Sequence, residues 1–319
     1  MATLKEIARK AGVSIRTVSR VIKNKPHISE KTAKRVQKVL DKFSYTPNLL
    51  ARGLKAGRTN MLAVIASSLG QQVLTKKLAC LLNTADNYGY KTLLGITDGD
   101  REKEECFVQE FAFSCDGFFF LSKPDNKNLR ILEKVSKPFV FVDVQSSRYP
   151  CVPIDRQAGV IEAIETVKQH YKKCIFITPS SDKREPRRCG FEKAMADMQV
   201  RSEIINIPIG YFEDGYKAVE RIGDFDKTLI VCYSDKLAVG LLKRLYELNI
   251  DIPAQAGVIG FDDDDYTEFT YKALSTISQS VTELADKSVD MLVKQISGKK
   301  FSKRCIVETK FVPRQTTIV

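Results

Sequence analysis

Positive charge is concentrated in the first fifth of this chain. Residues 1–60 contain 15 Lys and Arg but only 3 Asp and Glu, whereas the remaining residues contain 36 of each sign, so the net charge of +12 comes from the N-terminal segment. A basic block joined to a neutral body is typical of a nucleic-acid-binding module, because Lys and Arg replace the counter-ions of the phosphate backbone. The sequence therefore predicts a separate DNA-binding domain at the N-terminus.

The length and composition of the chain indicate folded domains without a membrane segment. At 319 residues the chain is too long for one hydrophobic core and predicts two or three domains, with a first boundary at the charge step near residue 60. No apolar leader follows Met1, and no uncharged run approaches the roughly 18 residues of a membrane span. We therefore expect a cytoplasmic protein with no membrane partner.

The cysteines and the acidic run Asp262–Asp265 do not indicate a metal site. The eight cysteines are scattered and form no C-x-x-C pair, so we expect them to be reduced and mostly buried. Consecutive acidic residues on a loop cannot all turn toward one ion, and no calcium-loop spacing follows them. The sequence predicts neither a metal nor another cofactor.

Two short helices joined by a tight turn are predicted at the N-terminus. Thr3-Leu4-Lys5-Glu6 fits a capping box, in which the Thr hydroxyl and the Glu carboxylate satisfy each other's backbone N–H groups. The first helix ends at Gly12. Ser14 caps a second helix that continues to about Lys23, and its inner face carries Val18, Val21 and Ile22.

The second helix is predicted to be the DNA-reading element. Its outer stripe consists of Ile15, Arg16, Thr17 and Arg20. Arg side chains bind guanine edges in the major groove and an apolar side chain contacts the thymine methyl, which is the geometry of a helix-turn-helix module. The alternative is a generic three-helix bundle with a solubilising outer face, but such faces usually mix charges and this one is almost purely positive.

A third helix completes the small N-terminal core. Ser29 is its expected cap, and its lysines and arginine point mostly outward. The side chains expected to face inward are Ala33, Val36, Val39, Leu40 and Phe43.

Residues 46 to 55 predict a further short helix that folds only against a partner. Thr46 and Pro47 supply a cap and a first helical residue. An isolated apolar helix of this length is unstable in water, and the expected partner is a DNA minor groove, in which Leu54 inserts while Arg52 and Lys55 contact phosphates. The alternative is a plain linker.

These motifs resemble the lactose/galactose repressor (LacI/GalR) family of bacterial transcription regulators. The resemblance is carried by Thr3–Ala8, Ala11–Ser14, Thr17–Val21 and the segments Tyr45–Asn48 and Ala51–Leu54. It implies that Ile15, Arg16 and Arg20 read bases and that Leu54 is the intercalating residue of a hinge helix that orders on the operator. The full set of DNA-binding residues expected from the pattern and the resemblance is Thr3, Ser14, Ile15, Arg16, Thr17, Arg20, Asn24, Ala51, Arg52, Leu54 and Lys55.

From residue 61 the pattern alternates between strands and helices. Apolar strands are predicted at 61–66, 91–95, 117–121 and 138–143, and again at 174–178, 203–207, 228–233 and 258–261. Helices are predicted near 73–88, 101–113, 127–135, 156–170, 187–199, 214–222 and 235–249. Such alternation indicates parallel sheets, here in two doubly wound α/β halves.

The C-terminal segment is predicted to return to the first half. Residues 276–279 are a crossover, 281–296 a helix, and 306–311 a strand, so the chain crosses between the halves three times. The expected domains are a helix-turn-helix head at 1–45, a hinge and linker at 46–60, and an effector-binding and dimerisation domain at 61–319. Within the last, one subdomain comprises about 61–155 and 280–303, the other about 156–277 and 306–319.

A ligand cleft is expected between the two halves, because ligands of such sheets bind outside the carboxyl ends of the strands. Asp143, Ser234 with Asp235, and Asp262 follow strands in this way. The other reading of Asp235 is a helix N-cap. The whole body also resembles the same family through Arg187–Phe191, Tyr233–Gly240 and Val258–Asp263, which implies a periplasmic-binding-protein-like fold.

The same resemblance implies roles for three positions of the cleft, and Asp143 and Ser234 are weaker matches. Arg187 grips hydroxyl or acidic groups of the ligand, and Asp262 accepts hydrogen bonds from it. Tyr211, or Phe212 beside it, is the aromatic wall. The expected effector-binding residues are therefore Asp143, Arg187, Tyr211, Ser234 and Asp262.

Enzyme functions are not supported by the sequence. His27 and His170 are the only histidines, neither adjoins a nucleophile motif, and no Walker, G-x-S-x-G or G-x-G-x-x-G pattern occurs. We expect a homodimeric repressor that binds a pseudo-palindromic operator in double-stranded DNA and responds to a small effector, first a sugar or sugar derivative and second a purine. The alternative is a cytoplasmic sugar sensor or solute-binding protein without operator function.

Overall fold

The computed structural model describes residues 3–22, 26, 28–43, 58–196 and 200–319. The chain forms two compact units, Met1–Thr59 and Asn60–Val319, which we call the head and the body and describe separately. Asn24 and the predicted hinge residues Ala51, Arg52, Leu54 and Lys55 lie outside the described residues. No helix in the described ranges is long and apolar enough to cross a membrane.

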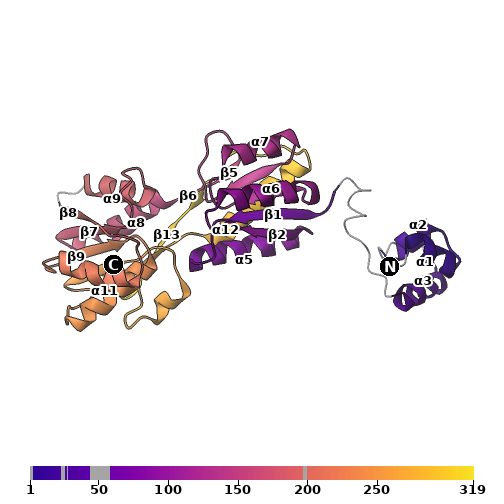
Figure 1. Cartoon of the computed structure of the whole chain (residues 1–319). Helices are drawn as coiled ribbons and strands as arrows, with labels where there is room; N and C mark the ends of the chain where they lie inside the picture. The colour runs from indigo at the N-terminus through magenta and orange to yellow at the C-terminus, as the bar shows by residue number, and fades with distance from the viewer. Residues whose placement is uncertain (1–2, 23–25, 27, 44–57, 197–199) are drawn as a thin grey trace. The chain divides into compact units, whose positions relative to one another are not determined.

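The described residues of the head form the helices α1 (Leu4–Ala11), α2 (Ile15–Ile22) and α3 (Glu30–Lys42) (Figure 1). The capping box at Thr3 is confirmed, and Gly12 ends α1 in the left-handed conformation with φ 61°. Ser14 and Ser29 cap the next two helices by accepting hydrogen bonds from the backbone N–H three residues later. Local capping signals thus determine where each helix of the head begins.

The head has a small core whose central side chains are fully buried. Its largest fully buried side chain is Ile7, and Val18 and Val36 have no exposed surface. The inner faces predicted for α2 and α3 are confirmed with one exception. Phe43 is 39% exposed and lies outside the core, because α3 ends at Lys42 and Phe43 is its C-cap.

The first half of the body is built on a parallel sheet with strand order β2-β1-β3-β4-β5. The strands are β1 (Met61–Ala66), β2 (Lys91–Ile96), β3 (Gly117–Phe120), β4 (Phe139–Val142) and β5 (Cys151–Val152). The helices α5 (Gln72–Asn87) and α12 (Val281–Ile296) pack on one face with Leu62 and Val64. The helices α6 (Arg101–Ser114) and α7 (Asn126–Lys134) cover the other face, against Ala63 and Ile65. Alternate residues of each strand therefore supply two separate cores.

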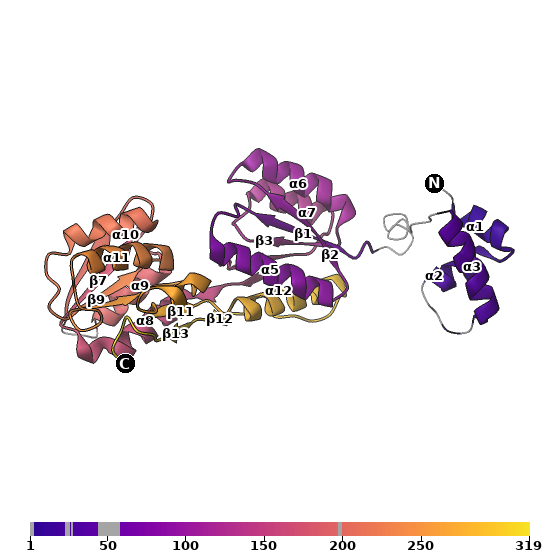
Figure 2. The ribbon, with the colours of Figure 1, turned by 90° about the horizontal axis from the view of Figure 1, so that it is seen from below.

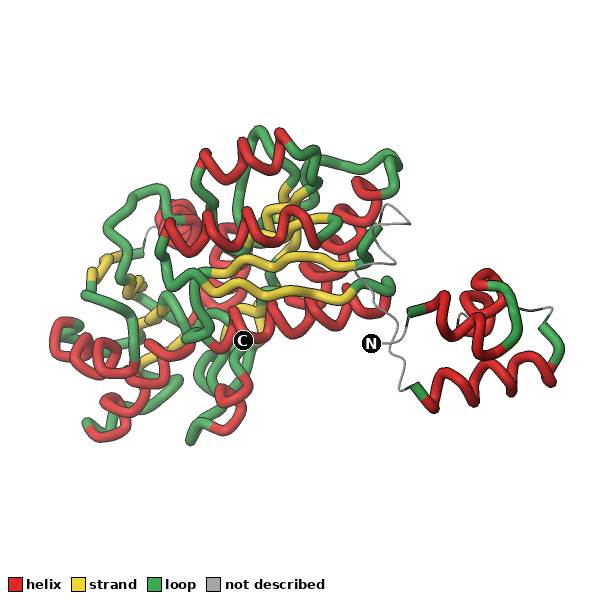
Figure 3. The backbone as a smooth tube through the Cα atoms, turned by 45° about the vertical axis from the view of Figure 1, so that its right-hand side comes forward, coloured by secondary structure: helices red, strands yellow, loops and turns green. Residues whose placement is uncertain are grey.

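The second half repeats this plan with strand order β10-β9-β7-β8. The strands are β7 (Lys173–Thr178), β8 (Arg201–Asn206), β9 (Thr228–Cys232) and β10 (Ala256–Ile259). One face carries α8 (Arg156–Val167) and α9 (Pro186–Ala196), and the other carries α10 (Phe212–Ala218) and α11 (Asp235–Glu247). Figure 3 shows helices on both sides of the strands in the body. The predicted doubly wound α/β fold is confirmed.

Three segments connect the halves, as the sequence predicted. Short β6 (Ile154–Asp155) pairs in parallel with β12 (Val307–Glu308), and β11 (Thr276–Ser278) pairs antiparallel with β13 (Lys310–Val312). The sequence did not predict β5, β6 or the turns of 3₁₀ helix η1 (Lys168–His170), η2 (Val219–Arg221) and η3 (Asp265–Phe269). The helix predicted at 46–55 lies outside the described residues, and the strand predicted at 306–311 consists of the two short strands β12 and β13. The other predicted elements are present, with ends that differ by a few residues.

The cysteines are less buried than the sequence suggested. All eight are free, and four of them are buried, namely Cys115, Cys151, Cys174 and Cys232. Burial raises the pKa of Cys115 and Cys174 to about 12, so both side chains remain thiols at neutral pH. Cys106 is exposed, and the other three are half-buried. No group of three or more His, Cys, Asp or Glu in the described part of the chain could hold a metal ion.

Replacement of Gly240 by Ala should destabilise the second half. Helices α10 and α11 pack closely (Figure 2), and a Cβ atom on Gly240 would lie 1.8 Å from the carbonyl oxygen of Phe212. The helices must separate to relieve this clash, at a cost of about 1–3 kcal/mol. Thermal unfolding should show a lower Tm for Gly240→Ala, whereas Gly70→Ala is the matched control because a Cβ there meets no atom within 4 Å. Equal Tm values for the two variants would contradict the close packing.

Candidate functional site

The outer face of α2 presents part of the predicted DNA-reading stripe. Ile15 is 46% exposed, and Arg16 is exposed beside it at the start of the helix. Thr17 is half-buried, and its backbone N–H and hydroxyl both contact the Ser14 hydroxyl, at 3.1 and 2.9 Å. Ser14 and Thr17 therefore order the first turn of α2, while Ile15 and Arg16 are exposed to solvent.

Arg20 differs from the exposed side chain that the sequence predicted. Its guanidinium donates a hydrogen bond of 2.7 Å to the carbonyl oxygen of Pro26, and the residue is half-buried. The side chain thus spans from α2 to the turn that precedes α3. Thr3 is exposed and is the N-cap of α1. Its hydroxyl and backbone N–H both form hydrogen bonds with Glu6 in the capping box.

In the body, Asp143 is the centre of a buried ion cluster between the halves. It follows β4 with φ 60°, in the left-handed region that non-glycine residues rarely adopt. Its Oδ2 accepts hydrogen bonds from Lys77 Nζ at 2.7 Å and from Arg156 Nη2 at 2.5 Å. Burial by itself would raise the pKa of Asp143, but Arg156 and Lys77 together hold it below the usual value. Asp143 is therefore an ionised carboxylate at neutral pH.

Lys77 and Arg156 reach Asp143 from different halves. Lys77 lies on the buried face of α5 and is only 4% exposed, whereas Arg156 begins α8 in the second half. Burial lowers the pKa of Lys77, and the charge of Asp143 opposes this effect. The ion pairs thus join α5 and β4 of the first half to the first residue of α8.

Gln279 continues the cluster to Asp262. Its side-chain oxygen accepts a hydrogen bond of 2.7 Å from Lys77, and its amide nitrogen donates to Asp262 Oδ1. Asp262 follows β10 with φ 119°, and burial raises its pKa to about 6 although Arg187 and Lys77 lower it. The structure therefore brings Asp143 and Asp262 into one polar network through Gln279 and Lys77.

Arg187 is held against the second half by three contacts. Its Nε donates to Glu185 at 2.9 Å, its Nη1 donates to the Tyr233 carbonyl at 3.0 Å, and the guanidinium lies 3.4 Å from the centre of the Tyr233 ring. The side chain is 8% exposed. Arg187 acts on Asp262 through charge alone, because no hydrogen bond between them is present.

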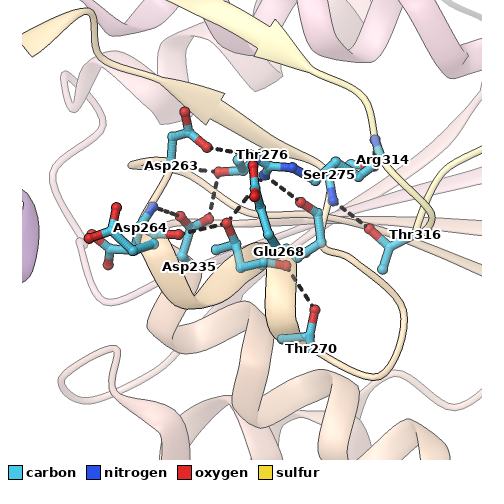
Figure 4. Close-up of polar contacts among 12 residues, drawn as sticks. Asp235, Asp263, Asp264, Glu268, Thr270, Ser275, Thr276, Arg314 and Thr316 are labelled. Carbon is cyan, nitrogen blue, oxygen red and sulfur yellow. Dashed lines mark hydrogen bonds and ion pairs between the residues drawn. The ribbon is translucent and has the colours of Figure 1, made fainter.

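Ser234, not Asp235, is the N-cap of α11, so the N-cap interpretation of Asp235 is wrong. The Ser234 hydroxyl accepts the hydrogen bond from the Leu237 N–H, and it also donates to the carbonyl of Gly210. Asp235 is fully buried and accepts hydrogen bonds from the Asp264 N–H at 2.8 Å and the Thr276 hydroxyl at 2.6 Å (Figure 4). Asp235 is therefore a structural residue that holds the loop after β10.

Each residue of the acidic run Asp262–Asp265 has a different partner. Asp263 accepts a hydrogen bond of 2.8 Å from Arg314, as Figure 4 shows, and Asp264 accepts from the Tyr266 hydroxyl. Asp265 forms an ion pair of 2.7 Å with Lys76 of the first half. The run is consequently a fixed loop whose two ends, Asp262 and Asp265, face the other half.

Further hydrogen bonds join the halves at the rim of this region. Lys76 Nζ donates to the Asp263 carbonyl at 2.8 Å, and Gln72 donates to Asp265 at 3.1 Å. Lys236 on α11 donates to the Gly70 carbonyl at 3.2 Å and lies over the ring of Tyr211 at 5.7 Å. The start of α5 therefore contacts the loop after β10, and Gly70 just before α5 contacts the start of α11.

The predicted aromatic wall lies at this rim rather than in the ion cluster. Tyr211 is 49% exposed at the start of α10, and Phe212 is 46% exposed with its ring 6.2 Å from that of Tyr266. Of the five predicted residues, the structure places Asp143 and Asp262 in one network, and Arg187 interacts with the charge of Asp262. Ser234 and Tyr211 belong to the neighbouring rim formed by α10 and α11.

Sequence reasoning missed Lys77, Arg156 and Gln279. The sequence did contain a signal for Lys77, since it lies four residues from both Val73 and Leu81 on the buried face of α5. A lysine in an apolar stripe is rarely buried without a charged partner. Arg156 and Gln279 gave no such signal, because both lie at crossovers whose neighbours come from distant parts of the chain.

Comparisons with known proteins identify both units. Residues 3–48 match the family described as bacterial regulatory proteins of the lacI family, and residues 165–317 match the periplasmic binding protein-like domain. The regulator RegA of Clostridium saccharobutylicum is 27% identical over 332 residues, and the alignment covers 100% of both chains. Catabolite control protein A of Streptococcus mutans is 26% identical, with 96% of this chain and 94% of that protein covered.

Solved structures show the same fold. The lac repressor dimer bound to operator and the anti-inducer ONPF matches with a TM-score of 0.84 at 22% identity, covering 100% of this chain and 99% of that one. The complex of the regulator CelR with cellobiose matches with a TM-score of 0.68 at 21% identity, covering 99% of this chain and 100% of that one. The curated relatives are transcription regulators and not enzymes. The chain is therefore a DNA-binding transcriptional regulator, in which residues 3–48 match the LacI family of bacterial regulatory proteins.

Proposed function

We propose that this regulator is a cytoplasmic repressor that binds a pseudo-palindromic operator as a homodimer. The observation that carries the proposal is the outer face of α2, where Ile15 and Arg16 are exposed on a basic head with a closed core. Two such heads in a two-fold dimer would read two half-sites in opposite orientation. A relative named PurR from Vibrio vulnificus, 27% identical over 95% of both chains, is a repressor.

The body provides surfaces that would suit a homodimer. Strand β2 is an edge strand of the first sheet, next to α5, and Leu94 on it is 39% exposed. On the second half, Phe269 and Tyr271 are each 85% exposed. Large exposed apolar side chains mark association surfaces, so we assign these two surfaces to the dimer contact.

The cleft network would couple a small effector to operator binding. Lys77 and Asp143 of the first half contact Arg156 and Gln279 beside the second half, so a ligand that enters the network changes how the halves meet. A change in that arrangement shifts the equilibrium between two body conformations, with a typical coupling of about 1–3 kcal/mol. Two solved neighbours contain the ligands ONPG and cellobiose, which supports a sugar or a sugar derivative here.

Replacement of Arg16 by Ala should lower operator affinity and relax base preference at one position of each half-site. Selection of duplexes from a random library by the full-length protein would first define the operator, which should be pseudo-palindromic. The loss of a bidentate contact to a base then costs about 1–3 kcal/mol per site, measured by fluorescence anisotropy at fixed salt. Lys38→Ala on α3 is the control, since Lys38 is exposed and lies outside the reading helix.

Three results would refute the operator function. They are recovery of duplexes without two-fold symmetry, unchanged preference in Arg16→Ala, or affinity for DNA that does not fall as salt rises. In the last case the alternative function, a sugar sensor without operator binding, would remain.

A further inference from the structure

Two buried cations between the halves share one oxygen of a single carboxylate. Lys77 Nζ and Arg156 Nη2 both contact Asp143 Oδ2, at 2.7 and 2.5 Å. The other oxygen, Asp143 Oδ1, is buried and has no hydrogen-bond partner. Two positive charges thus contact one negative charge, and only the Oδ2 atom of that carboxylate accepts hydrogen bonds.

No second carboxylate contacts these cations directly. Among the described residues, Asp262 forms no ion pair within 4 Å, and its Oδ1 is taken by the neutral amide of Gln279. Glu185 pairs with Arg187 instead. Asp262 therefore acts on Lys77 and Arg156 only at longer range, where its attraction is weaker. At contact distance the cluster keeps one uncompensated positive charge.

The same cations also have unused donors. A lysine ammonium has three N–H donors and an arginine guanidinium has five. The hydrogen bonds of Lys77 end on Asp143 and Gln279, and those of Arg156 end on the same two acceptors through Nη2 alone. A group that carries negative charge and several acceptor oxygens would satisfy both the charge and the donors.

The Oδ1 atom of Asp143, which has no partner, requires a hydrogen-bond donor in the ligand in addition to the acidic group. A buried carboxylate oxygen without a partner is costly and is satisfied by an O–H or N–H donor. A ligand hydroxyl beside the acidic group would supply that donor. The two needs together describe a small hydroxylated acid.

We propose that the cleft binds a small hydroxylated ligand with a carboxylate or phosphate group, which Lys77 and Arg156 hold as cations while Asp143 accepts a ligand hydroxyl. This inference rests on the proposed effector function and narrows the ligand from sugars in general to their acidic derivatives. Lys77 and Arg156 are then the residues that select the charge of the ligand. With a neutral sugar, the two cations would still share a single carboxylate at contact distance.

Matched pairs of ligands test the charge directly. The thermal unfolding of the full-length protein is measured with D-gluconate against D-glucitol and with glucose 6-phosphate against glucose, at about 10 mM and constant ionic strength, with inorganic phosphate as a further probe. An acid should raise Tm by several degrees while its neutral counterpart does not, since a ligand bound only by the folded state stabilises it. The two pairs separate a carboxylate from a phosphate site.

Charge-removing variants link the response to the two cations. Titration of the acid that raises Tm should show at least tenfold weaker binding to Lys77→Met, which keeps the length of the side chain. Arg156→Gln should weaken binding similarly and serves if Lys77→Met does not fold. Lys299→Met is the control for general anion binding, because Lys299 is exposed at the far end of α12 from the cleft residues and should leave the acid affinity unchanged.

Four outcomes would overturn the inference. They are equal shifts by a neutral ligand and its acid, no shift with any acid of the panel, acid affinities within twofold of wild type in both cleft variants, or an equal loss in Lys299→Met. Operator binding by the same preparations distinguishes this failure from that of the proposed function. Normal operator binding with no acid response refutes only the ligand class, whereas acid binding without operator binding refutes only the repressor function.

Discussion

A protein that lacks residues 1–59 should bind its operator at least about 1000-fold more weakly than the full chain. Specific binding typically exceeds non-specific binding by three or more orders of magnitude, and the truncation removes both α2 and the hinge helix predicted at 46–55. The remaining body also has no electrostatic attraction for DNA, because residues 61–319 hold 36 basic and 36 acidic side chains. Anisotropy titrations over a range of salt concentrations measure both effects.

The body should nevertheless remain folded after this truncation. Residues 60–319 form their own compact unit with separate cores on both faces of two sheets. Its thermal unfolding should therefore match that of the body in the full-length protein, and this is the control for the binding loss. Operator affinity within tenfold of the full chain would place the reading element in the body and refute the role of α2.

The helices of the head could be predicted closely because their signals are local. Thr3, Ser14 and Ser29 each cap the helix that follows, by hydrogen bonds to residues three positions away. The exposure of Phe43 could not be predicted in this way, since it depends on α3 ending at Lys42, and no local signal marks that end. Arg20 lies on the expected face of α2, but its bond to Pro26 depends on the turn and not on helical spacing.

In the body, long apolar strands were predictable and short ones were not. Strands such as β7 carry continuous apolar runs, which is typical of buried parallel sheet. By contrast, β6 has two residues, and its partner β12 is about 150 positions away in the sequence. No local pattern indicates such a pairing, because it exists only once both halves have folded.

In the candidate site too, residues marked by a local pattern could be predicted, and those determined by contacts between distant segments could not. Asp143 and Asp262 were found because they follow strands, and the fold brings strand ends together. The choice between Ser234 and Asp235 as N-cap could not be made locally, since both residue types cap helices well. It is decided by the loop after β10, which buries Asp235 against Asp264 and Thr276.

Replacement of Asp143 by Ala should destabilise the body by about 3–5 kcal/mol. Removal of one partner from a buried ion pair leaves the other charge without compensation, and here two cations lose their shared carboxylate. Lys77 is only 4% exposed and cannot regain full hydration without local opening. Chemical denaturation of the wild type and the variant at neutral pH measures the loss.

Two companion variants separate the charge from the shape of the side chain. Lys77→Met alone should cost less than Asp143→Ala, because Arg156 still pairs with the carboxylate in that variant. The double variant should be more stable than Asp143→Ala alone, since it removes the stranded ammonium. A double variant that is less stable than either single variant would mean that packing, and not charge, dominates this cluster.

The pH dependence of the same comparison has a definite sign. Burial already lowers the pKa of Lys77, and loss of Asp143 removes the main attraction that opposes this effect. In Asp143→Ala the pKa of Lys77 in the folded chain therefore falls further below its pKa in the unfolded chain. At a pH between these two values the unfolded chain binds more protons than the folded chain, so stability rises with pH there. The deficit relative to wild type should therefore shrink as the pH rises into the alkaline range, and in the double variant this dependence should disappear. A stability deficit that stays constant with pH would show that the ammonium of Lys77 is not the charge left unpaired. The loss of stability would then be attributed to Arg156, whose guanidinium remains charged over the whole pH range.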